Sequence, residues 1–347
     1  MSHRVIQWAT GSIGKTCLRT IIDSPELELA GLYVYSDRKA GRDAGDIARR
    51  DPTGVIATRD RDEILATPAD VVVHTARLQL PYERHDADIC ALLRSGKNVI
   101  TTAGNHYPHA HGAERVAMFE QACADGGTSL FGVGVSPEVI GERITMALAA
   151  TSADLESLSI DEVFDASGMI SPDFVFTVMG MGADPAATDL VTGELPVLYR
   201  MLYSETLRYM ADHLGLTDYQ VVDDHHLELA DHDTTVRAGV IRAGTVVATE
   251  WRWHVVADGV RRISLAIVWT MDPSLSRYAG RPHWTVRMTG RPALTMTIDL
   301  HDPVDAQVMT TAGQYIAAGI VRQAIPVVVQ APPGIVLPPQ FAPYRFR

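Results

Sequence analysis

The sequence predicts an α/β protein with a doubly wound parallel sheet at its N-terminus and a separate C-terminal α+β domain. Three observations lead to this prediction. Apolar strand-like segments alternate with helix-like segments over residues 1–135. A turn of small residues joins the first strand to the first helix, and after about residue 140 the pattern changes to strands that alternate apolar and polar residues.

Length and composition bound the possible functions. A chain of 347 residues is long enough for two domains, and 46% hydrophobic with 21% charged residues is ordinary for a globular protein. The net charge of −12 disfavours a nucleic-acid partner. No uninterrupted apolar run approaches the roughly 18 residues of a membrane span. Three cysteines without a C-x-x-C pair, and an N-terminus that enters the first strand without a signal peptide, favour a cytoplasmic location.

The first part of the chain gives the elements of the parallel sheet in order. The expected strands lie near 4–9, 29–36, 70–75, 97–102 and 128–134, and the expected helices near 12–23, 43–49, 60–66, 83–95 and 112–126. In such sheets the ligand lies beyond the carboxyl ends of the strands. The segments that follow each strand are therefore the candidates for a binding site.

The first of these segments is the most informative. Residues 4–14 form an apolar strand that turns through Gly11 and Gly14 into a helix, with Ala9 in place of the usual first glycine. Backbone N–H groups and the helix dipole at such a turn suit the diphosphate of a dinucleotide. The pattern predicts a Rossmann-type fold with cofactor contacts from Thr10, Gly11, Ser12, Ile13 and Gly14. An ordinary strand–turn–helix corner is the alternative.

The end of the second strand bears on the choice of cofactor. Ser36, Arg38 and Lys39 can hold a 2′-phosphate, which favours NADP(H), whereas Asp37 can serve the ribose of NAD(H). Alternatively, Arg38 and Lys39 form a solvated turn. The ends of later strands add further expected cofactor contacts, namely His74, Thr75 and Ala103.

The second part of the chain predicts an antiparallel sheet with one covered face. Helices are expected over 139–151, 172–181 and 196–214, strands over 234–242, 249–256, 262–269 and 284–288, a helix over 303–325 and a Pro-rich tail over 331–347. We therefore expect a dinucleotide-binding domain over 1–137, a substrate and dimerisation domain over 138–302, and a helix with its tail over 303–347.

Several segments resemble blocks of the dihydrodipicolinate reductase-like superfamily, in the branch of 2,4-diaminopentanoate dehydrogenase and the native amine dehydrogenases. They are Gly41–Gly45, Phe164–Phe176 with Met179–Gly182, Thr289–Leu294 and Ala324–Val336. The resemblance implies a nicotinamide dinucleotide domain, a homodimer, and a last helix that packs back on the first domain. It also implies an oxidoreductase that reduces a C=O or C=N bond, with ammonia incorporated in the amine dehydrogenase branch. A ketone, aldehyde, imine or amine is then the small-molecule partner.

One departure from the family pattern is serious. Members that make amines need a carboxylate just after the fifth strand, but residues 101–108 contain no Asp or Glu. Where the family has Asn-Pro-Gly in the next loop, this chain has Ser136-Pro137-Glu138. Either Glu138 replaces the missing acid, or the reaction is different. The alternative function is a catalytically silent NADP(H)-binding regulatory or sensor protein.

The same loop supplies the candidates for proton transfer. His106 titrates near neutral pH and can be the general acid, and Tyr107 can donate to a developing alkoxide, whereas Asn105 can only orient groups or stabilise charge. Alternatively, His106 and Tyr107 line a solvated loop, and Glu138 only favours a helix N-terminus.

In the second domain, Phe174, Phe176 and Met179 are candidates for an apolar substrate wall, with core packing as the alternative. The Asp- and His-rich segment 223–233 matches no metal-ligand spacing, so no metal is expected.

Overall fold

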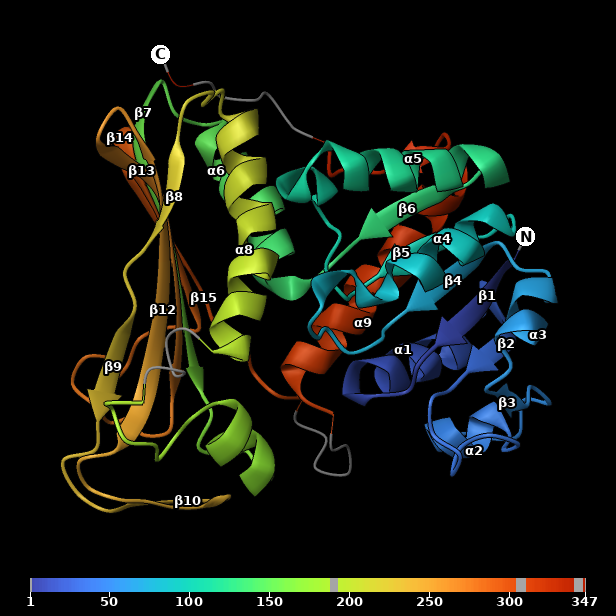
Figure 1. The fold of residues 1–347 in the computed structure, drawn as a ribbon, viewed down its shortest axis with the longest axis horizontal. Coiled ribbons are helices and arrows are strands. Elements are labelled where there is room, and N and C mark those ends of the chain that lie inside the picture. The colour runs from blue at the N-terminus through green and yellow to red at the C-terminus, as the bar shows by residue number, and fades with distance from the viewer. Residues whose placement is uncertain (1, 188–192, 304–309, 340–345, 347) are drawn as a thin grey trace. The chain divides into compact units, whose positions relative to one another are not determined.

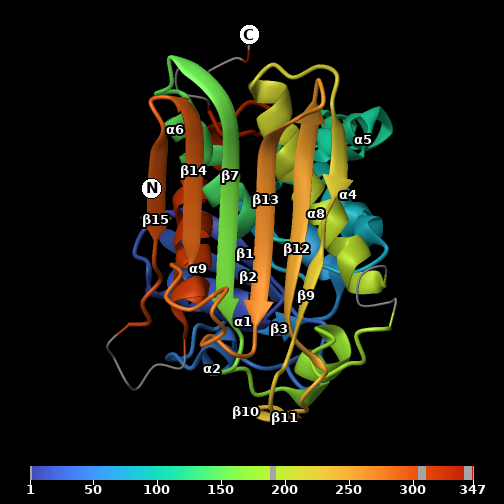
Figure 2. The same ribbon diagram turned by 90° about the vertical axis from the view of Figure 1, so that its left-hand side faces the viewer.

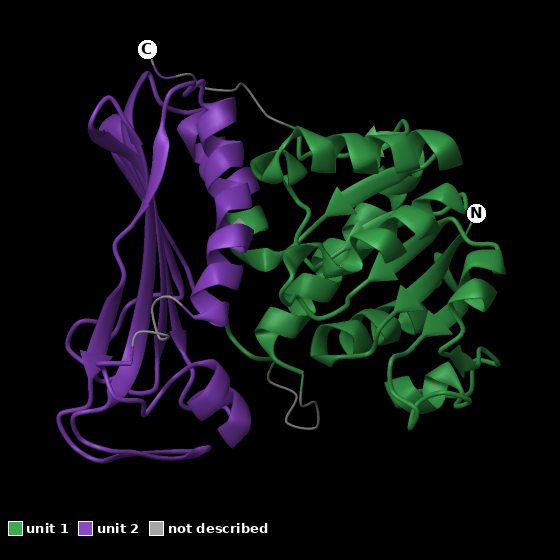
Figure 3. Ribbon diagram, in the orientation of Figure 1, with its two compact units in different colours: residues 1–140, 301–339 green, residues 141–300, 340–347 purple. Residues whose placement is uncertain are grey.

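The computed structural model describes residues 2–187, 193–303, 310–339 and 346. The chain divides into two compact units (Figure 3). Unit 1 comprises Met1–Ile140 and His301–Pro339, and unit 2 comprises Gly141–Leu300 and Gln340–Arg347. The expected assignment of functions to residues 1–137, 138–302 and 303–347 stays a prediction. Residues 304–309 of the expected last helix and 340–345 of the expected tail lie outside the described residues.

Unit 1 is built on a seven-stranded parallel sheet in the order β16-β6-β5-β4-β1-β2-β3 (Figure 1). The strands are β1 His3–Trp8, β2 Leu27–Tyr33, β3 Ala57–Thr58, β4 Val71–His74, β5 Asn98–Thr101, β6 Ser129–Gly132 and β16 Gly334–Ile335. The order 3-2-1-4-5-6, extended by β16, is that of a dinucleotide-binding sheet, and it reverses between β1 and β4. The predicted fold class is confirmed, and the short β3 was not predicted.

Helices cover both faces of this sheet. They are α1 Ser12–Asp23, α2 Ala44–Ala48, α3 Arg61–Ala66, α4 Asp86–Arg94, α5 Ala113–Gly126 and α9 Ala312–Gln330, with the short 3-10 helices η1 Tyr82–His85 and η2 Pro108–His111. Val5, Val71 and Val73 pack with α1 and α9, whereas Trp8 and Val72 pack with α4 and α5. Because both faces are buried, the inner positions of the strands are mostly apolar, as in Val71–Val73 of β4.

Helix α9 differs from its expected range of 303–325. A capping box formed by Thr311 and Gln314 starts the helix, and it continues through Pro326 to Gln330. It is long and apolar enough to cross a membrane by length and composition. However, Val321, Ile325 and other residues of the same side are buried against the sheet, so α9 is a core helix of unit 1.

Unit 2 contains a second seven-stranded sheet, in the order β15-β14-β7-β13-β12-β8 with β9 also paired to β12 (Figure 2). Its strands are β7 Asp154–Asp165, β8 Gln220–Asp223, β9 His226–Leu229, β12 Val246–Ala257, β13 Val260–Thr270, β14 Trp284–Arg291 and β15 Leu294–Ile298. The described pairings of this sheet are antiparallel, as expected, except that β7 pairs with β13 in parallel. Strands β8, β9 and β15, and the extent of β7, were not predicted.

The remaining elements of unit 2 cover one face of this sheet or lie at its end. They are α8 Glu194–His213, α6 Met146–Ala149, the π-helical segments η3 Val135–Thr145 (which begins in unit 1) and η4 Asp173–Val178, and the hairpin of β10 Thr234–Val236 and β11 Gly239–Ile241. The strand expected over 234–242 is therefore two short strands. Tyr199 and Tyr203 of α8 pack against Trp251, Trp253 and Trp269 of the sheet.

Candidate functional site

The turn from β1 to α1 leaves room for a ligand at the start of the helix. A Cβ added at Gly11 would meet no atom within 4 Å, and α1 begins without a side-chain cap or an acidic residue in its first turn. At Gly14, by contrast, a Cβ would lie 2.4 Å from the carbonyl oxygen of Ala9. Gly11 thus faces open space and Gly14 packs the helix against the strand. Backbone N–H groups of Ser12 and Ile13 lie in the uncapped first turn, so the residues present fit a diphosphate.

The buried side chains of Gln7 and Thr75 hold this turn through hydrogen bonds. Ala9 takes the left-handed conformation (φ 73°) that a glycine adopts more easily. The side-chain amide of Gln7 donates to the Ala9 carbonyl at 2.9 Å and to the Thr75 hydroxyl at 2.8 Å, and that hydroxyl donates to the Trp8 carbonyl at 3.0 Å. In the described structure Thr75 therefore supports the turn. Its predicted contact with the cofactor itself stays a prediction.

Lys39, in the loop that follows β2, contacts the same turn. Its ammonium donates to the carbonyl oxygen of Thr10 at 2.8 Å and to the Thr10 hydroxyl at 2.9 Å. Partial burial, and after it the charges of Lys15 and Arg42, lower the pKa of Lys39. Three cations thus gather beside the turn, where they favour an anionic ligand.

The other residues predicted near β2 lie further out. Arg38 is exposed, and the carbonyl of Ser36 accepts the backbone N–H of Lys39 at 3.0 Å. Asp37, the candidate for an NAD(H) ribose, forms an exposed ion pair with Arg59. The charged side chains near Thr10 are therefore basic. Asp37, the acidic residue of this loop, is already paired with Arg59.

The loop after β5 brings four predicted residues together. Ala103, Asn105, His106 and Tyr107 are all buried, so the alternative of a solvated loop is wrong for this segment. The Ala103 N–H donates to the Thr101 hydroxyl at 3.1 Å, and Tyr107 stacks on His109 with ring centres 4.8 Å apart.

Neighbouring backbone and side chains fix the shape of this loop. Gly104 and Asn105 both have positive φ angles of 76° and 63°. A Cβ on Gly132 of β6 would lie 2.3 Å from the backbone of Asn105 and His106, so the loop crosses the end of β6 in direct contact. The Asn105 side chain accepts two N–H groups of Arg115, an arginine of α5.

His74 lies at the end of β4 but not on an open surface. Its ring is completely buried between Trp8 and His85, and its Nδ1 shares a hydrogen bond of 3.2 Å with the Thr101 hydroxyl. Burial, and after it the nearby His85, lower the pKa of His74 to about 3. The ring is therefore neutral at physiological pH, and its predicted contact with a cofactor stays a prediction.

Glu138 lies in η3 and is completely buried. One of its carboxylate oxygens accepts the backbone N–H of Gly134 at 3.2 Å. This contact with an N–H just before η3 is also what the alternative of a carboxylate at a helix N-terminus predicts, so the catalytic role of Glu138 stays a prediction.

The predicted substrate residues of unit 2 belong to one apolar cluster. Met179 is buried in it, with Val175 and Val247, whereas Phe174 and Phe176 are half-buried at its edge. The Phe176 ring covers Gly182 and Gly239, where an added Cβ would lie 3.4 and 3.1 Å from it. Met179 thus packs in the core of this cluster, and a substrate wall formed by Phe174, Phe176 and Met179 stays a prediction.

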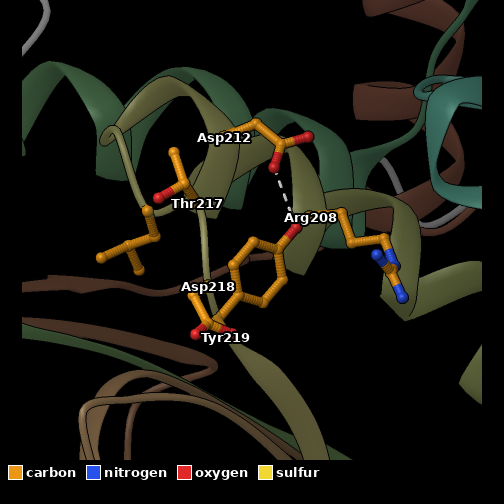
Figure 4. A pocket seen from close by; sticks show the side chains of 6 residues that line it. Arg208, Asp212, Thr217, Asp218 and Tyr219 are labelled. Atoms are coloured by element: carbon orange, nitrogen blue, oxygen red, sulfur yellow. Dashed lines mark hydrogen bonds between the residues drawn. The ribbon is translucent and has the colours of Figure 1, made fainter.

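A separate cavity of about 440 Å³ lies at the C-terminal end of α8 (Figure 4). It is lined by Arg208, Asp212, Leu216, Thr217, Asp218 and Tyr219. The Tyr219 hydroxyl donates to Asp212 at 2.8 Å, and burial together with this carboxylate raises the pKa of Tyr219 to about 12. None of the predicted site residues lines this cavity.

Two further features concern reactive groups. Among the described residues, no group of three or more His, Cys, Asp or Glu side chains is placed to hold a metal ion. The three cysteines are buried and unbridged, and burial raises the pKa of Cys17 to about 12 and that of Cys123 to about 11. These thiols stay protonated and unreactive.

Sequence reasoning missed several residues that shape the site. Gln7 is a polar residue inside an apolar strand, and Arg115 lies on the same helical stripe as Phe119 and Cys123. A polar or charged residue on a buried face is the signal that could have found both. Gly132 at the end of β6 carries no such signal, since only the path of the neighbouring loop makes it necessary.

Comparisons with known proteins agree with this fold. No family model matches the sequence. The chain is 28% identical to an amine dehydrogenase of Streptomyces virginiae, over 95% of this chain and 93% of the relative. It resembles the structure of an amine dehydrogenase from Mycobacterium smegmatis with a TM-score of 0.77 and 18% identity, covering 98% of this chain and 97% of the other. A biliverdin reductase from Synechocystis, solved with biliverdin and NADP+, matches with a TM-score of 0.52 and 12% identity over 93% and 90% of the two chains.

Proposed function

We propose that the chain is an NAD(P)H-dependent oxidoreductase that acts on a C=O or C=N bond of a small, mainly apolar substrate. The observation that carries the proposal is the open turn at Gly11, which lies where the strand order of a dinucleotide-binding sheet reverses. The similarity to the Streptomyces amine dehydrogenase over 95% of the chain supports the same activity class.

NADP(H) is the proposed cofactor, with NAD(H) as the second choice. Lys39 contacts Thr10 of the turn, Lys15 and Arg42 add positive charge near Lys39, and Arg38 is an exposed cation on the same loop. A 2′-phosphate carries charge that these side chains can neutralise. Asp37 would have to leave Arg59 before it could bind a ribose hydroxyl.

The buried loop after β5 supplies the proposed proton-handling groups. A bound reduced nicotinamide supplies the hydride. His106 or Tyr107 gives the proton to the developing alkoxide or amine, and Asn105 orients the loop. Phe174 and Phe176 provide apolar substrate contacts.

The missing acid decides between carbonyl reduction and amine formation. Residues 101–108 lack a carboxylate, and Glu138 is the buried carboxylate that we propose in its place. A buried carboxylate can accept a proton from ammonium or from an imine-forming intermediate. Ammonia use therefore depends on Glu138.

The activity is tested by NADPH oxidation at 340 nm with a panel of apolar ketones and aldehydes, with and without ammonium. Turnover that requires ammonium supports an amine dehydrogenase, and turnover without ammonium supports simple carbonyl reduction. Glu138→Gln should abolish the ammonium-dependent part, whereas the exposed Glu114→Gln is the matched control. NADPH binding without any turnover would instead favour a cofactor-binding sensor.

We also propose a cytoplasmic homodimer. The three buried, unbridged thiols are consistent with a reducing compartment. Light scattering on purified protein tests the dimer, and cell fractionation tests the location.

A further inference from the structure

The loop after β5 is tied to a buried arginine on a neighbouring helix. Arg115 of α5 is only 7% exposed, and its guanidinium donates to the side-chain oxygen of Asn105 through Nε at 3.2 Å and through a terminal nitrogen at 2.9 Å. The same terminal nitrogen donates to Asp86 at 2.9 Å. One planar group thus links the loop to the start of α4.

The surroundings fix the guanidinium in place. Asp86 is also buried, and Glu83 lies 3.6 Å away as a second carboxylate. The rings of Tyr82 and Phe119 lie 5.1 and 5.8 Å from the guanidinium carbon. A buried cation with ionic, hydrogen-bonding and aromatic partners has little freedom to move.

Asn105 is the residue of the loop that the fixed guanidinium of Arg115 contacts. It has the left-handed backbone conformation and lies directly before His106 and Tyr107. On its other side, the Tyr82 ring occupies the space where Gly104 would carry a Cβ, with the hydroxyl 2.1 Å from that point. The side chain of Asn105 thus joins this double turn to α5.

We propose that Arg115 is a positioning residue, which sets the conformation of residues 105–107 through the side chain of Asn105 and so places His106 and Tyr107. The effect on catalysis rests on the proposed function, whereas the effect on the loop does not. Asp86 acts with Arg115 by holding its guanidinium in the orientation that Asn105 needs.

Lysine cannot replace this arginine. An ammonium on a flexible stem does not reproduce two fixed N–H groups aimed at Asn105 together with a third contact to Asp86. Arg115→Lys therefore keeps the charge and loses the geometry. Asn105→Gly is the complementary variant, because glycine keeps the left-handed backbone while the amide is removed.

Hydrogen–deuterium exchange of the peptide covering residues 101–108 tests the loop directly. We expect exchange in Arg115→Lys and in Asn105→Gly to rise on the order of tenfold over the parent protein. The double variant should exchange no faster than Asn105→Gly alone, because Arg115 acts through Asn105. Arg94→Lys is the matched control, since this exposed arginine pairs with Asp125 at 3.3 Å on the outside of α4 and α5.

Kinetics test the catalytic part on the carbonyl compound that the NADPH assay identifies. The kcat of Arg115→Lys should fall on the order of tenfold to a hundredfold, with the KM for NADPH changed less than about twofold. The pH dependence of kcat should also shift, because a merely structural role would not alter the environment of the proton donor.

Unchanged exchange of residues 101–108 in Arg115→Lys overturns the inference, and so do additive effects in the double variant. If Arg115→Lys fails to fold, Asn105→Gly and Asn105→Ser carry the same test. If the protein binds no NADPH, the proposed function fails, but the exchange measurements still decide whether Arg115 sets the loop.

Discussion

The turn after β1 and the loop after β5 lie at the carboxyl ends of strands in one sheet, yet their glycines have opposite surroundings. Gly11 in the first turn has no atom within 4 Å of an added Cβ. Gly104 and Gly132 at the second loop are covered by Tyr82 and by the backbone of Asn105 and His106. The comparison separates two uses of the same residue type. A glycine beside empty space leaves room for a ligand, and a glycine in contact with the chain permits tight packing of the protein itself.

The largest effect is expected at Gly14. This glycine lies in the turn after β1, but it is in contact with the chain rather than beside empty space. A methyl group there would lie 2.4 Å from the Ala9 carbonyl oxygen and 2.5 Å from the Thr75 hydroxyl. Gly14→Ala should lower the free energy of unfolding of unit 1 by about 3 kcal/mol, because the helix must move away from the strand. This change is measured by urea unfolding, with hydrogen exchange of unit 1 peptides as the probe of the folded fraction.

Gly11→Ala is the matched substitution at a glycine that lies beside empty space. Its backbone conformation suits alanine, so the free energy of unfolding should change by less than about 1 kcal/mol. NADPH binding should nevertheless weaken on the order of a hundredfold, because the methyl group occupies the space beside the helix amides. Calorimetric titration measures the affinity. Unchanged NADPH affinity would show that this space does not receive the diphosphate.

The difference between the two loops also explains what the sequence could predict. The turn after β1 is made by residues that are adjacent in the chain, so strand, glycines and helix could be read together. The loop after β5 depends on Tyr82, Arg115 and Gly132, which are distant in sequence. The residues His106 and Tyr107 could be named as candidates, but their burial could not be derived from their neighbours.

The same limit applies to the second sheet. Strand β7 alternates apolar and polar residues, but Glu162 occupies a covered position, where it accepts the Trp284 indole N–H at 2.8 Å. This carboxylate at a covered position obscured the strand pattern. The parallel pairing of β7 with β13 depends on contacts between segments about 100 residues apart, and no local pattern reports it.

A smaller effect is expected from the cations beside the open turn. Lys39→Met removes two hydrogen bonds to Thr10 and one cation proposed for the 2′-phosphate, so it should weaken NADH binding on the order of tenfold and NADPH binding more than that. Arg38→Ala leaves the turn intact and should weaken NADPH binding only. Parallel titrations with both cofactors measure the difference. Equal losses for NADPH and NADH in Arg38→Ala would remove this arginine from the 2′-phosphate site.

The last effect is confined to acidic pH and concerns the loop after β5. His74 shares a hydrogen bond with Thr101, the last residue of β5 before the loop. Its pKa of about 3 is far below the roughly 6.5 of a histidine in the unfolded chain. Between these values the unfolded chain binds one more proton at this site. The contribution of His74 to the free energy of unfolding is therefore fully present above pH 6.5 and decreases by about 1.4 kcal/mol per pH unit as the pH falls towards 3. His74→Asn keeps a polar group near Thr101 and removes the titration, so its unfolding free energy should depend less steeply on pH between 6 and 4. The exposed His301→Gln serves as the control, and equal slopes in His74→Asn and the parent protein would contradict a neutral His74 beneath the loop.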